Sequence, residues 1–216
     1  ARGGGEPALS KRARHKKNKA ARKLQAREQA WAGRVAAVEA AVDAALAATA
    51  LPQQCIDGAI KFRRAVESDL DSLFALVKEF AKVEEQESAL QITADELRRD
   101  LFGTDKFFYS IVAEKEEEDL VGFAFFSPSH ATWLGRTLYL EDLYLRAAEQ
   151  RTGAGKALLE VLARAARELG CAKLTWQALS DNEQAHTFYE MIGAKKTSDW
   201  ISFQMDKNAI DAFTKK

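Results

Sequence analysis

A strand, a glycine-rich turn and a helix follow one another in the second half of the chain. Residues 136–145 (RTLYLEDLYL) alternate apolar and polar side chains, as strands do. Residues 150–155 (QRTGAG) come next and open a run with helical apolar spacing. Glycines at such a turn let the backbone approach a phosphate, and the first amides of the helix can bind it. An ordinary strand–helix turn can also look like this, so the motif alone leaves both interpretations open.

Strands and helices alternate from Ile60 onward, which predicts an α/β domain with a mixed central sheet. Thr93 followed by Glu96 predicts a capping box, and Ser68 or Asp69 is expected to cap the helix before it. The expected strands cover residues 60–65, 107–114, 120–128, 136–145, 171–179 and 198–206, and the expected helices cover 69–84, 93–103, 153–170 and 182–193.

The net charge of zero hides a strong asymmetry along the chain. Residues 1–34 hold eleven Lys or Arg and two acids, so this part carries +9 and the remainder −9. Residues 11–50 are rich in helix formers and predict one long helix that ends before Pro52, with a possible break near Gly33. Residues 51–58 (LPQQCIDG) read as a linker. We therefore expect a basic helical extension and linker over 1–59, followed by a domain over 60–216.

Composition excludes several classes of protein. No run of eighteen apolar residues is present, so a membrane helix is not expected and the protein should be soluble. Cys55 and Cys171 are the two cysteines, and no Cys–His cluster has metal-ligand spacing. We therefore predict no metal site and an intracellular location, either cytoplasm or mitochondrial matrix.

The segment 60–206 resembles the Gcn5-related N-acetyltransferase (GNAT) superfamily, and within it the diamine and thialysine acetyltransferases. The similarity rests on residues 132–145 (TWLGRTLYLEDLYL), the loop at 150–155, residues 182–194 (NEQAHTFYEMIGA) and the final DWISFQM. It implies a GNAT fold with acetyl-CoA as the cofactor.

The resemblance also implies roles for single residues. The diphosphate would be held by backbone amides of Gln150, Arg151, Thr152, Gly153, Ala154 and Gly155. Leu143 and Leu145 would pair with the pantetheine arm through their main chain, and Asn182 would bond the cofactor near its thioester.

Two further residues would perform the acid–base chemistry. Tyr189 would protonate the departing thiolate, and Glu141 would take a proton from the substrate ammonium. From the residues alone, Tyr189 beside Phe188 also fits a core aromatic pair, and Glu141 also fits a solvated strand position.

Glu84, Glu85 and Glu87 would supply acid near the amine entrance of the family, although a solvated helix end also fits them, and Trp133 aligns with a tryptophan of the polyamine enzymes. Ala131 stands where the polyamine enzymes have an acid, and Asp181-Asn182 stands where they have Trp-Asn. Polyamine specificity therefore does not follow.

Two functions are compatible with these features. The first is an N-acetyltransferase that moves an acetyl group from acetyl-CoA to a primary amine, on a small diamine-like molecule or a lysine-type side chain. The second is a GNAT-fold structural subunit of a large ribonucleoprotein, such as a mitochondrial or divergent ribosome. There the basic residues of 11–34 would contact RNA or an acidic protein. A homodimer is expected by default, or a place within a larger assembly.

Overall fold

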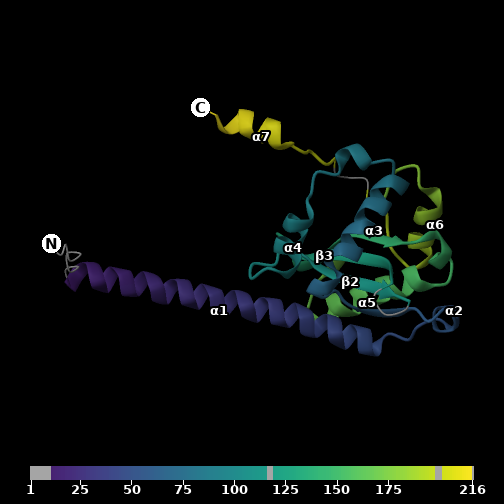
Figure 1. Cartoon of the computed structure of the whole chain (residues 1–216), viewed down its shortest axis with the longest axis horizontal. Helices are drawn as coiled ribbons and strands as arrows, with labels where there is room; N and C mark the ends of the chain where they lie inside the picture. Colours follow the sequence, from purple (N-terminus) through teal and green to yellow (C-terminus); the bar gives the residue numbers. More distant parts are fainter. Residues whose placement is uncertain (1–10, 116–118, 198–200, 216) are drawn as a thin grey trace, which may run out of the picture. The chain divides into compact units, whose positions relative to one another are not determined.

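A five-stranded mixed sheet forms the centre of the fold (Figure 1). The computed structural model describes residues 11–115, 119–197 and 201–215, with side chains from residue 17 onward. The strand order follows the chain. The strands are β1 (Lys61–Arg64), β2 (Tyr109–Glu114), β3 (Leu120–Ala131), β4 (Gly135–Leu145) and β5 (Lys173–Thr175). The first four pair antiparallel and β5 pairs parallel to β4, which confirms the expected mixed sheet.

Helices cover both sides of this sheet (Figure 1). On one side α3 (Leu70–Val83) and α4 (Ala94–Phe102) bury their leucines against the aromatic residues of the strands. On the other side α5 (Ala154–Glu168) packs against β4 and β5. The core on the α3 side contains Leu70, Leu73, Leu76, Leu97, Leu101, Val112, Leu120, Phe123, Phe125 and Tyr144.

Short-range capping signals are reproduced in part. Thr93 accepts from the Glu96 amide at 3.3 Å, and the Glu96 carboxylate accepts from the Thr93 amide at 2.9 Å, which confirms the capping box. Asp69 stands at the N-cap of α3 without a side-chain cap bond, at the end of a 3-10 turn, η1 (Glu67–Asp69). Its carboxylate is engaged by Arg63 and by the Val66 amide instead.

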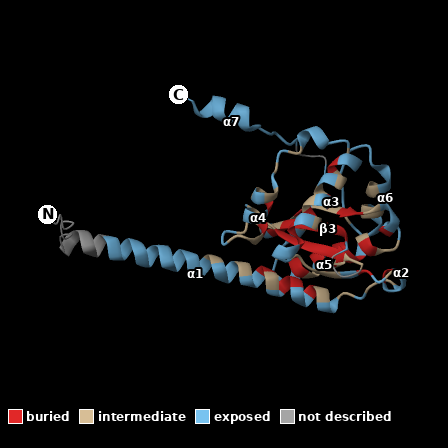
Figure 2. Ribbon diagram, viewed as in Figure 1, coloured by how far each residue is buried: buried red, intermediate tan, exposed pale blue. Residues whose placement is uncertain are grey.

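The extension forms one helix, α1 (Lys11–Ala48), which runs through Gly33 without a break. Its second half lies against α5 and β1, and Val38, Ala41, Val42 and Ala45 are buried there (Figure 2). A Cβ at Gly33 would meet nothing within 4 Å, so this glycine occupies an open helix position. The expected linker contains a short helix of its own, α2 (Gln53–Asp57).

The chain divides into two compact units, residues 1–176 and 177–216. The second unit contains α6 (Glu183–Met191) and α7 (Lys207–Thr214), and Asp206 caps α7 by accepting from the Ala209 amide at 2.7 Å. The expected domain boundary at 59/60 stays a prediction.

Two strand predictions need correction. Of the strand expected over 198–206, the first three residues lie outside the described part of the chain, and 201–206 form no strand. Of the strand expected over 171–179, β5 keeps three residues. Alternating apolar residues favour a strand, but a strand also needs a hydrogen-bonded neighbour. Pairing of β5 with β4 stops at Tyr139–Thr175.

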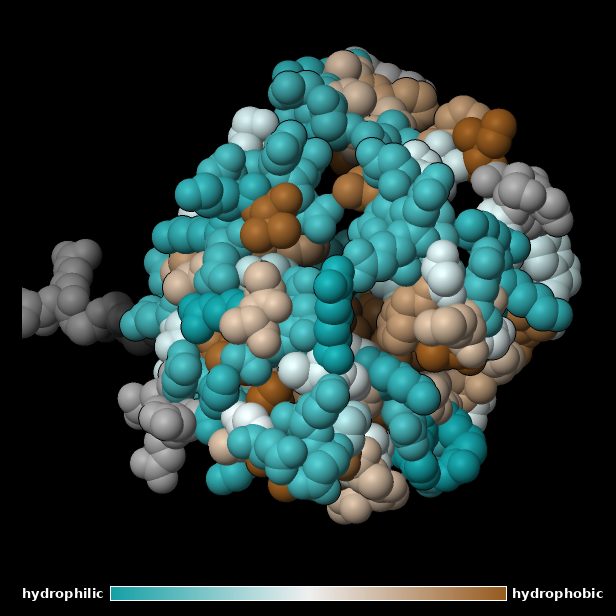
Figure 3. Space-filling view, turned by 90° about the vertical axis from the view of Figure 1, so that its right-hand side faces the viewer, coloured by the Kyte–Doolittle hydropathy of each residue, from teal (hydrophilic) through white to brown (hydrophobic). Residues whose placement is uncertain are grey.

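No helix in the described part of the chain is long and apolar enough to cross a membrane. On the face shown in Figure 3, hydrophilic side chains predominate and hydrophobic ones form small separate groups. The compartment in which the protein works stays a prediction.

Candidate functional site

The connection from β4 to α5 has the strand–turn–helix geometry expected from the sequence. β4 ends at Leu145, a 3-10 turn, η3 (Ala147–Glu149), follows, and α5 begins at Ala154. Gly153 is the N-cap residue with φ +88°, and Arg151 also has a positive φ of 61°. The left-handed backbone at Gly153 is one that glycine adopts without the steric cost of a side chain.

Hydrogen bonds within the loop fix its shape. The Gln150 side chain donates to the Leu145 carbonyl at 2.9 Å. The Thr152 hydroxyl donates to the Glu149 carbonyl at 2.8 Å and accepts from the Ala154 amide at 3.3 Å. Glu149 is itself buried and paired with Lys115 at 2.9 Å. The loop is therefore organised by its own side chains.

The linker after the N-terminal extension packs against this loop. Cys55 is fully buried, and its Sγ lies 3.5 Å from the Thr152 carbonyl oxygen. A Cβ built on Gly153 would come within 2.9 Å of Cγ of Pro52. Residues 52–55 thus contact the same loop whose glycines suggest anion binding.

A diphosphate fits the exposed side of this loop chemically. The first N–H groups of a helix have no partner inside it, and the helix dipole favours an anion there. The amides of Gln150 and Ala154 already have acceptors within the chain. In the expected set, the amides of Arg151, Thr152, Gly153 and Gly155 would therefore receive a bound diphosphate.

A bulge interrupts β4 in the middle of the sheet. Leu140 pairs with Phe126 and Asp142 with Phe125, so Glu141 is the extra residue of the bulge. Beyond the bulge, Leu143 and Leu145 pair with Ala124 and Gly122 of β3. Pairing with β5 has ended before this point. This leaves the β5-side edge of Leu143 and Leu145 without a strand partner in the described chain, as binding of an extended cofactor arm requires.

Two neighbouring carboxylates, Glu141 and Glu84, act on Asp142 at the bulge. Burial, and after it the charges of Glu141 and Glu84, together raise the pKa of Asp142 to about 6. Burial likewise raises the pKa of Tyr139, with Glu141 and Asp142 adding to the shift. Glu84 is the C-cap residue of α3, so α3 and β4, which are far apart in sequence, both bring negative charge to the bulge. Such a cluster attracts a cation.

Among the residues that the structure describes, no group of three or more His, Cys, Asp or Glu side chains is placed to hold a metal ion. An organic cation, such as an ammonium group, needs no fixed coordination geometry and is therefore the better match to three carboxylates.

Comparison with known proteins decides the family. The sequence profile of the "Acetyltransferase (GNAT) family" matches residues 70–194. The chain belongs to the GNAT family. It is therefore a GNAT-type N-acetyltransferase, and enzymes of this family use acetyl-CoA as a substrate.

Individual relatives agree with this assignment. The chain is 29% identical over 160 residues to a mouse thialysine N-epsilon-acetyltransferase, covering 69% of this chain and 94% of the relative. It is 32% identical over 146 residues to the Caenorhabditis elegans protein of the same name, covering 66% and 89%. An aminoglycoside acetyltransferase from an uncultured soil metagenomic sample shares the fold, with a TM-score of 0.60 and 24% identity over 70% of this chain and 99% of that one. The expected fold and resemblance are thus confirmed.

The remaining expected site residues of this GNAT enzyme lie in different places. Glu85 follows Glu84, is exposed and has a positive φ of 55°. Trp133 is 85% exposed in the turn between β3 and β4. From Gly135 to Glu141 the strand rises about 20 Å, so the structure does not bring Trp133 to the carboxylate cluster.

Asn182 and Tyr189 belong to the second compact unit. Asn182 is the N-cap of α6, and its side-chain oxygen accepts from the Ala185 amide at 3.0 Å, which leaves its amide nitrogen as a donor. Tyr189 lies on α6, half-buried, with its ring 5.4 Å from that of Phe188. Their roles at the cofactor stay predictions.

The sequence did not predict that Asp142 belongs to the carboxylate cluster or that Cys55 contacts the loop at 150–155. Strict alternation along β4 would place Asp142 on the face opposite Glu141, and the bulge breaks that alternation. Cys55 was interpreted as part of a linker. The RNA contact, the ribonucleoprotein role, the mitochondrial location and the oligomeric state also stay predictions, because the names of the relatives do not concern them.

Proposed function

We propose that this GNAT enzyme transfers the acetyl group of acetyl-CoA to a primary amine, on a small diamine-like molecule or a lysine-type side chain. The observation that carries the proposal is the cluster of Glu84, Glu141 and Asp142 at the bulge of β4, where burial and the two neighbouring charges together raise the pKa of Asp142 to about 6. A site built to attract an ammonium group would look like this. Relatives named for acetylating thialysine, an amine carried on a side chain, support the same substrate class.

The chain supplies the groups that the reaction needs. Acetyl-CoA brings the thioester from which the acetyl group leaves. An ammonium group has no free electron pair, so a base must first remove a proton. Glu141, exposed at the bulge, would accept that proton directly or through water, while Glu84 and Asp142 hold the cation. Tyr189 would donate a proton to the CoA thiolate as it leaves.

Free thiol released from acetyl-CoA measures the activity. The panel of acceptors includes lysine, thialysine, ornithine, short diamines, polyamines and a lysine-containing peptide. We expect turnover with at least one amine. Tyr189→Phe and Glu141→Gln should each lower kcat/KM by a factor of roughly 10² or more, as general acid–base groups do.

The control is Asp95→Asn, an exposed carboxylate in the first turn of α4, which should leave activity unchanged. Folding of every variant is checked by circular dichroism. If a folded protein that is stabilised by CoA acetylates none of these amines, the amine proposal is wrong. If both Tyr189→Phe and Glu141→Gln keep full activity, the residue assignments are wrong.

A further inference from the structure

Helix α1 consists of an anchored half and an exposed half. In the anchored half, Glu39 and Asp43 pair with Arg64 of β1 at 3.3 and 2.7 Å, and Lys106 pairs with Glu39 at 2.6 Å. Val42 is 1% exposed beneath these pairs. Every residue from 17 to 30 is exposed (Figure 2). A helix fixed at one end therefore presents its other end to solvent.

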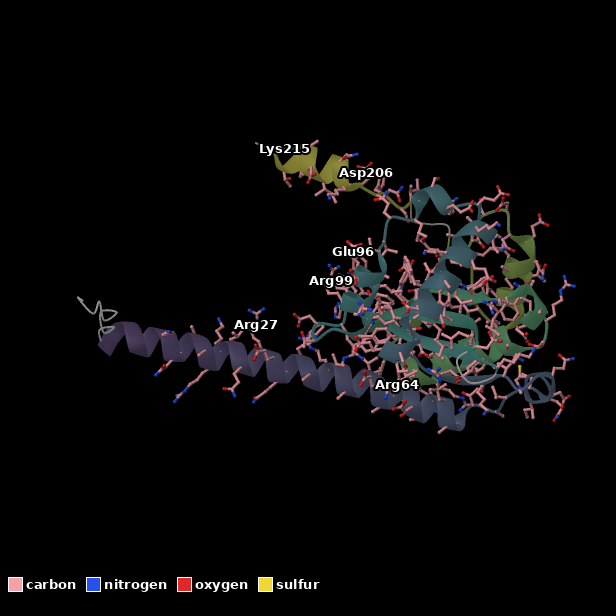
Figure 4. The ribbon with its side chains drawn as sticks, in the orientation of Figure 1. Arg27, Arg64, Glu96, Arg99, Asp206 and Lys215 are labelled. Atoms are coloured by element: carbon pink, nitrogen blue, oxygen red, sulfur yellow. The ribbon has the colours of Figure 1, made fainter. Side chains whose placement is uncertain are left out.

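The exposed half concentrates positive charge on one side. Lys19, Lys23 and Arg27 follow one another at four-residue spacing, and Arg22 comes three residues after Lys19. Residues three or four apart share one face of a helix. Arg34 lies seven residues beyond Arg27 and so extends the same face. We call the face made by Lys19, Arg22, Lys23 and Arg27 the basic face (Figure 4, where Arg27 is labelled).

Nothing in the described chain neutralises this face. None of the ion pairs between described residues includes a cation of the basic face. Between residues 11 and 34, Glu28 is the one acid. The first turn of α1 contains no acid either, so the positive helix terminus adds to the field.

This arrangement is unfavourable for an isolated helix. Like charges four residues apart destabilise a helix by about 0.2–0.5 kcal/mol per pair. Both Lys19–Lys23 and Lys23–Arg27 are such pairs. A polyanion on the basic face would remove this repulsion, so binding and helix stability favour each other.

The chemistry of the face distinguishes among polyanions. A membrane-surface helix needs a broad apolar side with Trp, Phe or Leu. Between Lys17 and Ala30, Leu24 is the one large apolar residue. A protein partner would need similar apolar anchors. A nucleic-acid backbone needs cations alone, and a duplex offers one charge per ~1.7 Å of its axis.

We propose that the basic face of α1 binds the phosphate backbone of a nucleic acid and thereby attaches the acetyltransferase domain to it. The contact does not depend on base sequence, because it is made to phosphates. The remainder of the chain, with a net charge of −9, repels the same polymer, so contact is confined to the exposed half of α1.

Fluorescence anisotropy of the 216-residue chain with labelled 24-base-pair duplexes of RNA and DNA, between 50 and 200 mM salt, tests the proposal. The test variant combines Lys19→Gln, Arg22→Gln, Lys23→Gln and Arg27→Gln, because Gln keeps the helix propensity. We expect affinity to fall at least tenfold at 100 mM salt. The slope of log K against log salt should become shallower by roughly 3.6, because each of the four phosphate contacts contributes about 0.9.

A matched control removes four cations elsewhere. Arg167, Lys173, Lys195 and Lys207 are exposed, and their combined replacement by Gln changes the net charge equally. This control should bind within twofold of the wild type. An equal loss of affinity in both variants would show that binding depends on net charge alone, and this would overturn the proposal. The proposal would also be overturned if the wild type bound both duplexes with dissociation constants above about 10⁻⁴ M at 50 mM salt, which is the weak limit of non-specific binding.

Two further arms identify the polyanion. Poly-glutamate that competes as well as nucleic acid at equal charge would indicate an acidic protein partner and contradict the proposal. A difference between the RNA and DNA duplexes would support it and tell which polymer is preferred. Acetyl transfer to amines is measured in the same samples and should be equal in all variants, so this result is independent of the proposed enzymatic function.

Discussion

The Sγ of Cys55 lies 3.5 Å from the carbonyl oxygen of Thr152. Cys55 belongs to α2, in the linker behind the basic extension, and Thr152 belongs to the loop expected to hold the diphosphate. The extension is therefore joined to the cofactor loop by packing as well as by the chain. A change in the linker should consequently be measurable at the cofactor.

Replacement of Cys55 by Phe tests this connection. Cys55 is fully buried, so the larger ring must displace the loop, and overpacking of this kind costs about 1–3 kcal/mol. We expect a lower melting temperature and a smaller stabilisation by CoA. Ile56→Phe is the control, since Ile56 is 55% exposed beside Cys55. Equal CoA-induced shifts in both variants would contradict the connection.

The two loop glycines should respond differently to alanine. A Cβ at Gly153 would meet Pro52 at 2.9 Å on a backbone with φ +88°, whereas a Cβ at Gly155 would meet Leu145 at an ordinary 3.7 Å. Gly153→Ala should therefore destabilise the protein by ~1–2 kcal/mol. Gly155→Ala should be neutral or slightly stabilising, since Gly155 lies in the first turn of α5.

Affinity for CoA then separates the roles of the glycines. If the diphosphate approaches Gly155 closely, Gly155→Val should weaken CoA binding at least tenfold, about 1.4 kcal/mol, while the protein stays folded. Thermal shift with and without CoA measures both quantities. A Gly155→Val variant that binds CoA like the wild type would show that the diphosphate lies elsewhere.

How far the sequence predicts the fold depends on how local the cause is. The capping box at Thr93 and the helix after Gly153 follow from interactions within a few residues, and both were predictable. The length of a strand depends on a neighbour distant in sequence. This is why residues 201–206, with their alternating apolar pattern, were wrongly predicted to be a strand.

In the candidate site too, features with a local cause were predictable and features that depend on distant residues were not. The loop at 150–155 was found because its glycines and the following helix are contiguous. The influence of Glu84 on Asp142 was not predictable, because it needs the end of α3 to meet the bulge of β4. The residues of the bulge include no glycine or proline, so the sequence contains no signal that predicts it.

The ion pair between half-buried Arg63 and the buried carboxylate of Asp69 should dominate acid sensitivity. Arg63 donates to both oxygens of Asp69, at 2.7 and 2.9 Å, and Asp69 is 6% exposed. Burial opposes its charge, but the bonds from Arg63 and the Val66 amide leave the pKa of Asp69 below its ordinary 3.8. This stabilisation is present above about pH 4 and is lost as pH falls through the lowered pKa.

Asp69→Asn should therefore lower the unfolding free energy at pH 7 by ~2–4 kcal/mol, because Arg63 keeps Glu114 but loses its bidentate partner, and the Val66 amide loses a charged acceptor. The matched control is Asp95→Asn, which removes the pair with Arg98 at a residue whose side chain is 91% exposed and should cost under about 0.5 kcal/mol. Urea unfolding of both variants gives the comparison. Similar losses in the two would show that burial does not set the strength of the pair.

The opposite pH dependence is expected at Asp142. Its pKa is about 6 in the folded chain against 3.8 for an ordinary aspartate, so folding favours the protonated form. The penalty for ionising Asp142 is absent below about pH 4, grows as pH rises, and is fully present above about pH 6.

Asp142→Asn removes the charge and should raise the unfolding free energy at pH 8 by about 1–2 kcal/mol relative to the wild type, since partial exposure reduces the full effect. At pH 4 the two proteins should be equally stable. Urea unfolding at both values measures this, with Glu87→Gln, an exposed carboxylate, as the control that should change little at either pH.

The same substitution should weaken acetylation of amines, because one of three charges that hold the ammonium group is lost. Stability gained together with activity lost would identify Asp142 as a residue kept for binding at a cost to folding. A stability difference that is the same at pH 4 and pH 8 would show that Asp142 is not held in its protonated form by the fold.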